Sequence, residues 1–295
     1  MNTGSDSFDQ YRPLLFSIAY RMLGSAMDAE DMVQEAFLGW QEDAPDEVQS
    51  PKAYLAAVVT RLSIDHLRLA YVQRETYVGP WLPEPILGGV PAGIGDAISM
   101  TETLTIPFLV LLESLSPVER AVFLLHDVFE YEYAEIAHIV DKSEANCRQM
   151  VSRARDHIAA RRPRFEVSSA QQQELIQQFI ETCVNGDMDG LLALLDKDIV
   201  EWSDGGGKVT AARNPIFGPA KVARLLLGLF KKAPPGMTIG FLEINGQPGV
   251  VTYEPDGRPH NVTFVDIGDR CIRGIYTVVN PDKLTKIPAL RVHNP

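Results

Sequence analysis

Cysteine is scarce in this chain of 295 residues: Cys147, Cys183 and Cys271 are its only three, and they lie far apart. An odd number of widely spaced cysteines excludes a disulfide framework and the paired cysteines of zinc motifs. Free thiols persist in reducing compartments, so we expect a cytoplasmic protein. No motif for a metal or another cofactor is present either, and we expect none to be bound.

Long apolar runs are also missing. No uninterrupted apolar segment approaches the roughly 20 residues that span a bilayer. The first residues, MNTGSDSFDQ, lack the basic and then apolar layout of a signal peptide. We therefore expect no membrane association. A hydrophobic fraction of 45% is ordinary for globular proteins, and the length allows two or three domains with their own cores.

Positive charge is in short supply, with 27 basic against 39 acidic residues and a formal net charge of −12. Residues 1–75 hold 12 acidic and 6 basic residues, and residues 28–47 hold eight acidic and no basic ones. Such a patch repels phosphate and attracts a basic protein surface. By contrast, six arginines against Asp156 alone lie between positions 148 and 164. Attraction to nucleic acid should therefore be local, as in a protein that binds DNA within a larger machine.

Residues 133–160 are the most informative segment, because they predict a helix, a tight turn at 141–143 and a second helix. Apolar residues recur in the second helix at offsets 0, 4, 7 and 11, which is one helical face. Ser143 can cap this helix. In DNA-binding proteins such a pair places its second helix in the major groove. The alternative is a solvated helical hairpin with a charged face. The apolar positions are Cys147, Val151, Ala154 and Ile158, and the polar ones are Arg148, Gln149, Ser152, Arg153 and Arg155.

Composition divides the chain into four parts. Residues 1–75 predict an all-α domain, with helices over 8–40 broken at Gly24–Ser25 and a third helix from about Lys52 to Tyr71. Residues 76–101 are rich in proline and glycine and predict a linker. Residues 102–166 predict a second all-α domain, in which Ser116 and Pro117 begin a helix. Residues 167–295 predict an α+β domain, with helices at 170–184 and about 219–232 followed by a meander of four strands.

The helical segments resemble the extracytoplasmic-function sigma factors, small promoter-recognising subunits of bacterial RNA polymerase. DAEDMVQEAFLGW (28–40) is similar to the core-binding helix of sigma region two, and RLSIDHLR (61–68) to its promoter-contacting helix. LSPVERAVFLLHDVFEYEYAEIAHIV followed by SRAR is similar to region four. The C-terminal part resembles the SnoaL-like, NTF2-like cone that one group in this family carries. That group is marked by WLPEP, DGGGK and NPDKL motifs, which occur here at 81–85, 204–208 and 280–284.

The resemblance implies a multidomain sigma factor that binds core RNA polymerase and promoter DNA and is not an enzyme. Charge-assisted hydrogen bonds to core polymerase are expected from Asp28, Glu30, Asp31, Gln34 and Glu35. Base capture is expected near residues 46–51, and contacts at the −10 element are expected from Lys52, Arg61, Asp65 and Arg68. The −35 element would be read by Arg148, Gln149, Ser152, Arg153 and Arg155.

The resemblance also implies regulation in cis by the C-terminal domain, in place of a separate anti-sigma protein. Packing of the DGGGK loop near the linker could fix the spacing of regions two and four. A small-molecule ligand in the C-terminal pocket is a further expectation, and the three glycines allow either a tight loop or an anion-binding nest. The alternative is a helix-turn-helix regulator fused to a SnoaL-like enzyme or ligand-binding domain, with Asp204, Asp266, Tyr253 and Tyr276 as candidate groups. The expected regulatory residues are Trp81, Pro83, Glu84, Asp204, Gly205, Gly206, Gly207 and Lys208.

Overall fold

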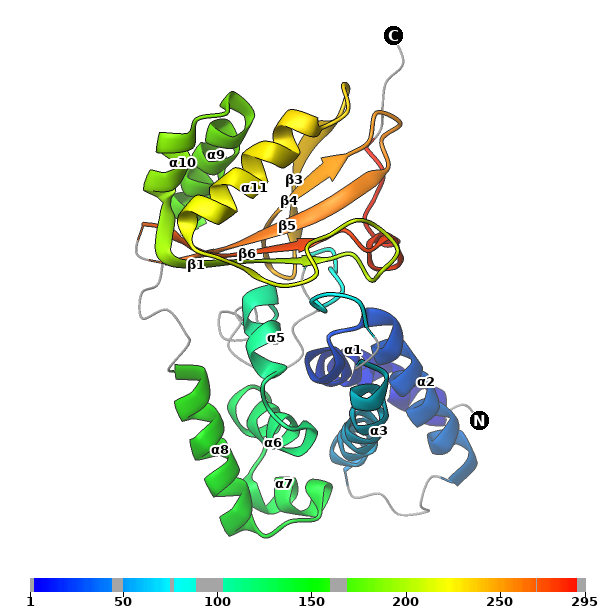
Figure 1. The fold of residues 1–295 in the computed structure, drawn as a ribbon. Helices are drawn as coiled ribbons and strands as arrows, with labels where there is room; N and C mark the ends of the chain where they lie inside the picture. Colours follow the sequence, from blue (N-terminus) through cyan, green and yellow to red (C-terminus); the bar gives the residue numbers. More distant parts are fainter. Residues whose placement is uncertain are drawn as a thin grey trace. The chain divides into compact units, whose positions relative to one another are not determined.

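The computed structural model describes residues 3–43, 50–74, 77–88, 103–159, 169–268 and 270–290. The chain forms two compact units (Figure 1). One contains Met1–Thr76 and Gly89–Arg162, and the other contains Tyr77–Gly88 and Pro163–Pro295. Half of the expected linker, residues 77–88, therefore belongs to the C-terminal unit. Within the described part, no helix has both the length and the hydropathy of a membrane span.

The first unit is all-α, as predicted. Gly24, with φ of 68°, makes the predicted break between the first two helices, since glycine adopts positive φ without steric strain. The helices of this unit are α1 (Thr3–Leu23), α2 (Ala26–Asp43), α3 (Pro51–Arg74), α5 (Ile106–Leu112), α6 (Pro117–Asp127), α7 (Tyr133–Val140) and α8 (Glu144–Ala159).

The predicted helix starts of the second all-α part are confirmed. Ser116 caps α6 in a reciprocal capping box with Glu119, and Pro117 occupies the first helical position. Ser143 Oγ accepts a hydrogen bond from the Asn146 N–H at the start of α8. Asp141 adopts the left-handed conformation that ends α7. The turn predicted at 141–143 thus separates the two helices of the helix-turn-helix.

Two buried arginines, Arg21 of α1 and Arg120 of α6, connect α1 with residues 103–129 of the same unit. Arg120 Nη1 donates to the Met22 carbonyl at 2.5 Å and to Glu113 at 3.0 Å. Arg21 Nε donates to Thr103 Oγ1 at 3.1 Å, and its guanidinium lies 5.6 Å from the Phe129 ring centroid. Burial lowers the pKa of Arg21 to about 10, so it remains charged at neutral pH. Because such charges are costly to bury without partners, these contacts specify how the helices pack.

The second unit is α+β, with its helices on one face of a six-stranded mixed sheet (Figure 1). The strand order is β2-β1-β6-β5-β4-β3, so the predicted four-strand meander is confirmed. The elements are α9 (Ser169–Asn185), α10 (Met188–Leu194), β1 (Leu195–Asp204), β2 (Ile216–Phe217), α11 (Pro219–Lys232), β3 (Thr238–Ile244), β4 (Gln247–Tyr253), β5 (Pro259–Ile267), β6 (Ile272–Val278) and the 3-10 helix η1 (Pro281–Leu284).

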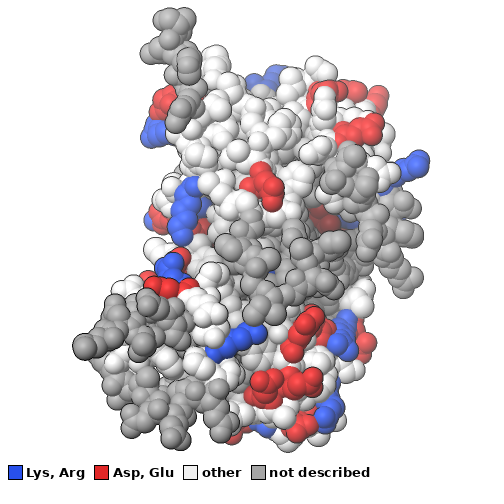
Figure 2. All heavy atoms as spheres, turned by 180° about the vertical axis from the view of Figure 1, so that it is seen from behind, with Lys and Arg blue, Asp and Glu red and all other residues white. Residues whose placement is uncertain are grey.

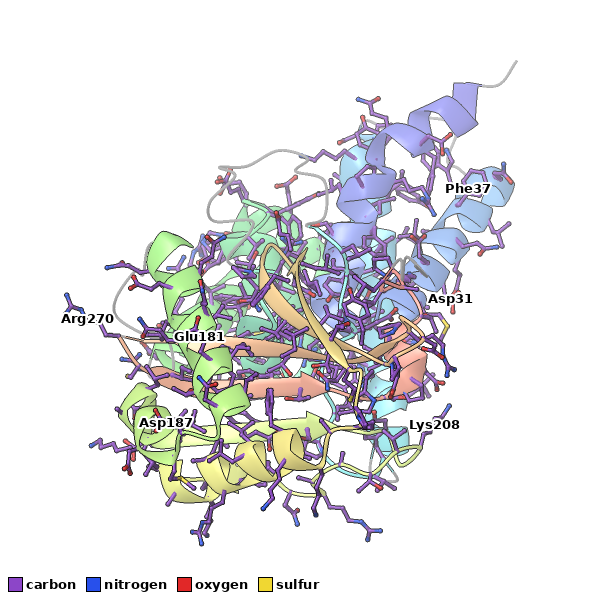
Figure 3. All side chains as sticks on the ribbon, turned by 90° about the horizontal axis from the view of Figure 1, so that it is seen from above. Asp31, Phe37, Glu181, Asp187, Lys208 and Arg270 are labelled. Carbon is purple, nitrogen blue, oxygen red and sulfur yellow. The ribbon has the colours of Figure 1, made fainter. Side chains whose placement is uncertain are left out.

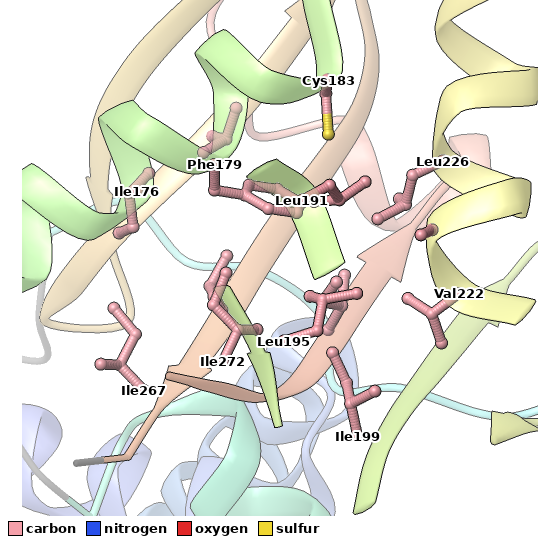
Figure 4. Packing of buried hydrophobic residues seen from close by; sticks show 14 residues of the cluster. Ile176, Phe179, Cys183, Leu191, Leu195, Ile199, Val222, Leu226, Ile267 and Ile272 are labelled. Atoms are coloured by element: carbon pink, nitrogen blue, oxygen red, sulfur yellow. The ribbon is translucent and has the colours of Figure 1, made fainter. Parts of the chain in front are cut away.

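The core of this unit lies between the sheet and its three helices (Figure 4). Phe179 of α9, Leu191 of α10 and Leu226 of α11 pack there against strand residues such as Ile199 and Ile275. Successive strand residues point to opposite faces of a sheet. Asp204 and Tyr276 therefore lie on the face away from the helices, since Ile199 and Ile275 point toward them.

Candidate functional site

The recognition helix α8 has the two faces that its sequence predicts. Cys147, Val151, Ala154 and Ile158 are buried. The five polar residues expected to contact the −35 element are exposed. Basic and acidic side chains alternate over the helical unit on the face that Figure 2 shows. Among the described residues visible on that face, no large surface of one sign appears.

The three arginines of α8 form intramolecular ion pairs. Arg155 makes two bonds of 2.7 Å with Asp127 of α6, which raise its pKa. Arg148 pairs with Glu144 at 2.8 Å and lies 5.0 Å from the Tyr133 ring centroid. Arg153 is 3.8 Å from Glu119. Exposed pairs of this kind are weak, so Arg148 and Arg153 can exchange their partners for DNA at little cost. Arg155 is the most firmly held of the three.

Arg61 of α3, an expected −10 contact, bonds to the helix-turn-helix. Its guanidinium donates to the carbonyls of His138 and Ile139, each at 2.9 Å. These carbonyls lie at the C-terminal end of α7, where helix carbonyls lack helical partners and attract cations. The same N–H groups cannot bond α7 and a DNA backbone simultaneously. A promoter contact through these N–H groups therefore requires that the bonds to His138 and Ile139 be broken, whereas Nη1 is not used in them.

The other expected −10 residues lie along the same helix. Asp65 and Arg68 are exposed and pair with each other at 2.8 Å, and Lys52 is partly exposed. Of the loop expected to capture a base, residues 46–51, positions 46–49 lie outside the described residues, and Ser50 and Pro51 lie at the start of α3.

The acidic side chains of α2 do not form one continuous stripe. Asp31, Gln34 and Glu35 are exposed at spacings of three and four residues (Figure 3 labels Asp31). Glu30 instead pairs with Arg12 of α1 at 2.5 Å, and Asp28 lies 3.7 Å from His66 of α3. Of the five residues expected to bind core polymerase, Asp31, Gln34 and Glu35 are thus the exposed ones, whereas Asp28 and Glu30 are partly buried.

A buried carboxylate, that of Asp204 at the end of β1, organises the second site. Its Oδ1 accepts hydrogen bonds from the Tyr77 hydroxyl at 2.5 Å and the Gly206 N–H at 3.0 Å. Its Oδ2 accepts from the Leu82 N–H at 2.9 Å and from Lys283 Nζ at 2.7 Å. Asp204 has no solvent exposure. Burial and the bond to Asp204 raise the pKa of Tyr77, so its hydroxyl stays protonated as the donor.

Lys283 of η1 holds the same segment from the other side. Its ammonium lies 4.1 Å from the Trp81 ring centroid and 5.5 Å from that of Tyr77. It also donates to the Leu82 carbonyl. A desolvated cation over aromatic rings contributes about 2 kcal/mol or more. Residues 77–82 thus provide hydrogen-bond or cation–π partners for both Asp204 and Lys283.

Residues 86–88 of the same segment form a second set of hydrogen bonds, with the turn between β3 and β4 and with the end of β3. The Ile86 N–H donates to Asn245 Oδ1 at 3.1 Å, and the Asn245 N–H donates to the Ile86 carbonyl at 2.8 Å. The Gly88 N–H bonds the Glu243 carbonyl at 2.8 Å. We call residues 77–88 the docked segment, since it bonds the C-terminal unit at both ends. Pro83 and Glu84 between the two sets of hydrogen bonds are buried.

The glycines of the DGGGK loop are required by close contacts. Gly206 and Gly207 have φ of 60° and 71°. A Cβ on Gly206 would come within 2.3 Å of the Asn280 side chain, and one on Gly207 within 3.1 Å of Val78. A Cβ on Gly205 would lie 2.8 Å from the Val209 carbonyl. Of the two expected roles of the three glycines, a tight loop and an anion-binding nest, these close contacts support the tight loop. Lys208 at its end pairs with Asp282.

Sequence reasoning missed four residues of this site: Tyr77, Asn245, Asn280 and Lys283. The NPDKL motif contains Asn280 and Lys283, although no role was assigned to them. Asn280 donates to the Tyr77 hydroxyl at 3.1 Å. The Asn245–Gly246 pair, both with positive φ, signals a hairpin turn, but nothing in the sequence signals its bond to Ile86. Tyr77 has no such signal at all.

The candidate enzyme residues do not form a site on the helix-covered side of the sheet. Asp204, Asp266, Tyr253 and Tyr276 all alternate with residues that face the core cluster, so they lie on the opposite face. Asp204 is engaged by the docked segment. Among the described residues, no cluster of histidine, cysteine and acidic side chains could hold a metal ion.

An exposed helix-turn-helix in an all-α unit is typical of DNA-binding proteins, and the comparisons specify the family. Residues 8–70 match the Sigma-70 region 2 family, and residues 106–158 match Sigma-70 region 4. The ECF RNA polymerase sigma factor SigJ of Mycobacterium tuberculosis is 36% identical over 292 residues, covering 95% of this chain and 93% of the relative. The ferric citrate uptake sigma factor FecI of Escherichia coli is 29% identical over 46% of this chain and 78% of its own length. The crystal structure of M. tuberculosis SigJ has a TM-score of 0.76, with 33% identity, and covers 97% of this chain and 100% of that one.

The chain therefore belongs to the ECF sigma factors of RNA polymerase. It directs transcription initiation by binding core RNA polymerase and promoter DNA. The predicted fold, two helical sigma regions followed by an α+β domain, is confirmed. The alternative, a helix-turn-helix regulator fused to a SnoaL-like enzyme or ligand-binding domain, is wrong in its class of protein, since the chain is a sigma factor.

Proposed function

We propose that the C-terminal unit regulates this sigma factor in cis by holding the docked segment. The observation that carries the proposal is the Asp204 carboxylate, whose two oxygens accept four hydrogen bonds, three of them from Tyr77, Leu82 and Lys283. Docking removes 12 residues from the free connection between the two sigma regions. A shorter free connection restricts the distance that regions two and four can span.

Covalent attachment strengthens this restraint. The segment and its binding site are parts of one chain, so the effective concentration of each near the other is high. An intramolecular restraint of this kind needs no separate anti-sigma protein. Whether a small molecule in the C-terminal unit modulates it stays an expectation from the resemblance. Since its partners are polymerase and promoter, the cytoplasm is its proposed location.

The contacts of the sigma regions are part of the same proposal. Asp31, Gln34 and Glu35 present the core-binding surface, with Asp28 and Glu30 beside it. Lys52, Arg61, Asp65 and Arg68 face the −10 element. Solvent exposure of these side chains supports the assignment, except where Arg61 bonds α7. The −35 element is read from α8 by Arg148, Gln149, Ser152, Arg153 and Arg155.

In vitro transcription with core polymerase tests the regulation. Asp204→Asn removes the charge that Lys283 and three other donors share, and breaking a buried pair costs about 3–5 kcal/mol. Since 1.4 kcal/mol is tenfold in an equilibrium constant, the docked state should cease to dominate. We expect transcription from a cognate promoter to rise several-fold at equal core-bound sigma factor.

Asp282→Asn is the matched control. It also removes a carboxylate paired with a lysine, but both partners are more than half exposed, so its effect should be small. Equal transcription by Asp204→Asn and the wild type, with the segment shown to be released, would contradict regulation in cis.

A further inference from the structure

The C-terminal unit contains a stretch in which the charge of the whole chain is reversed. Between Gly205 and Leu242 there are six basic and no acidic residues, in a chain of net charge −12. Four of the six lie on α11: Lys221, Arg224, Lys231 and Lys232. We call these four residues the basic stripe.

The stripe runs along one face of α11. Val222, Ala223 and Leu226 of this helix are buried in the core, whereas all four basic residues are exposed. Lys221 precedes Arg224 by 3 residues, and Lys231 and Lys232 follow it by 7 and 8 residues, so the four side chains lie on adjacent helical rows. Nitrogen-tipped side chains project from α11 away from the sheet (Figure 3). From Lys221 to Lys232 the stripe is about 16 Å long at 1.5 Å per residue.

The basic stripe differs from several other cations of this unit in its lack of ion pairs with described residues. No carboxylate among the described residues pairs with Lys221, Arg224, Lys231 or Lys232, and the Arg224 Nε bonds the Ala220 carbonyl of its own helix. By contrast, Lys197, Arg258 and Lys208 of the same unit each pair with a carboxylate. The arginines of α8 are paired as well. The stripe is therefore available to an anionic partner without first breaking an ion pair.

Helix stability does not account for the stripe. Lys231 and Lys232 in the last turn favour the helix dipole, but Lys221 is the third residue of α11, where a cation opposes it. Gly228 lies between Arg224 and Lys231 in the middle of the helix, where glycine is unfavourable. A Cβ there would meet nothing within 4 Å. Steric need thus does not explain Gly228, whereas close approach of a partner's backbone to this face would.

We propose that the basic stripe of α11 contacts the phosphate backbone of promoter DNA in the polymerase complex, which makes the C-terminal unit a third DNA-contacting part of the chain. Duplex DNA carries one negative charge per about 1.7 Å of its axis. A 16 Å length of duplex therefore carries about nine phosphates on its two strands together. Such contacts position a protein on DNA and read no sequence. This inference depends on the sigma factor assignment and not on regulation by the docked segment.

The salt dependence of promoter binding by the holoenzyme tests the proposal. Each phosphate contact adds about 0.9 to the slope of log K against log salt concentration. For full-length Lys221→Gln/Arg224→Gln combined with core polymerase, the slope should fall by about 1.8. Affinity should fall equally for the cognate promoter and for one with an altered −35 element. The melting temperature of this double variant should equal or exceed that of the wild type, because it lacks the cation at position 221 that opposes the dipole of α11.

A second double variant of the same unit, Lys197→Gln/Arg258→Gln, is the control, since it removes two exposed but paired cations. Its slope should stay at the wild-type value. Equal slopes for the two double variants would overturn the proposal. So would a loss of core polymerase binding by the stripe variant in the absence of DNA, because the stripe would then bind an acidic protein surface.

Discussion

At the scale of single residues, two buried carboxyl groups of the C-terminal unit have opposite surroundings. Asp204 accepts four hydrogen bonds, one of them from Lys283, with which it also forms an ion pair, so its burial is compensated. Glu201 is also buried, but only its Oε1 is bonded, by the Ser203 hydroxyl, while Oε2 has no hydrogen-bond partner among the residues that the structure describes. Desolvation by burial raises the pKa of Glu201. One carboxylate therefore stabilises the unit as an anion, and the other is tolerated best when protonated.

Glu201→Gln should change how stability depends on pH. In the wild type the folded state retains the Glu201 proton to a higher pH than the unfolded state does. The contribution of this proton to the stability of the folded state is therefore lost as pH rises from the pKa of the unfolded state, near 4.3, through the raised pKa of the folded state. The glutamine variant lacks this loss. Urea unfolding followed by tryptophan fluorescence at pH 4.5 and 7.5 should show the variant gaining relative to the wild type as pH rises. A difference that is independent of pH, or shared by the exposed Glu181→Gln, would contradict this.

The sequence predicted part of the docking site and not the rest. The WLPEP and DGGGK motifs, with the resemblance, indicated that the loop lies near the linker. Asn280 and Tyr77 join the docking site only through tertiary contacts, since these two residues, which bond each other, lie 203 residues apart in the sequence. No local pattern reports a contact at such a separation.

At the scale of elements, local sequence signals predicted the helices of the helix-turn-helix. Ser116, Ser143 and the apolar period of α8 fixed the helix starts and the buried face, because capping and periodicity are local properties. The strand β1 was missed. Its sequence LDKDIVEWSD follows α10 directly and pairs in parallel with β6. Parallel pairing across about 75 residues has no sequence signature of its own.

Arg61 of α3 links two elements and offers a discriminating test. If its main role is to contact the −10 element, Arg61→Ala should weaken promoter opening by about tenfold, since a hydrogen bond to a charged group contributes about 1.5–3 kcal/mol. Permanganate reactivity of −10 thymines in the holoenzyme complex measures this. Arg12→Ala, which removes an exposed arginine of α1, is the control. Stronger opening by Arg61→Ala would mean that the bond to α7 is the dominant role.

At the scale of the whole molecule, charge is divided by position along the chain. The acidic residues of α2 suit a basic protein surface, while α8 and α11 carry the cations that suit phosphate. The excess of acidic residues lowers non-specific attraction to DNA, so contacts made together with polymerase decide where the protein binds. Domain order and this charge pattern could be read from the sequence. The assignment of residues 77–88 to the C-terminal unit could not, because proline and glycine content predicts only irregular structure.

Amide hydrogen exchange tests the central claim most directly, since three backbone N–H groups report docking: those of Leu82, Ile86 and Gly88. In the free full-length chain these amides should exchange slowly, because each is bonded to the C-terminal unit. In the promoter-bound holoenzyme they should exchange rapidly, because activity requires release of the segment. Equal protection in the two states would contradict regulation by docking.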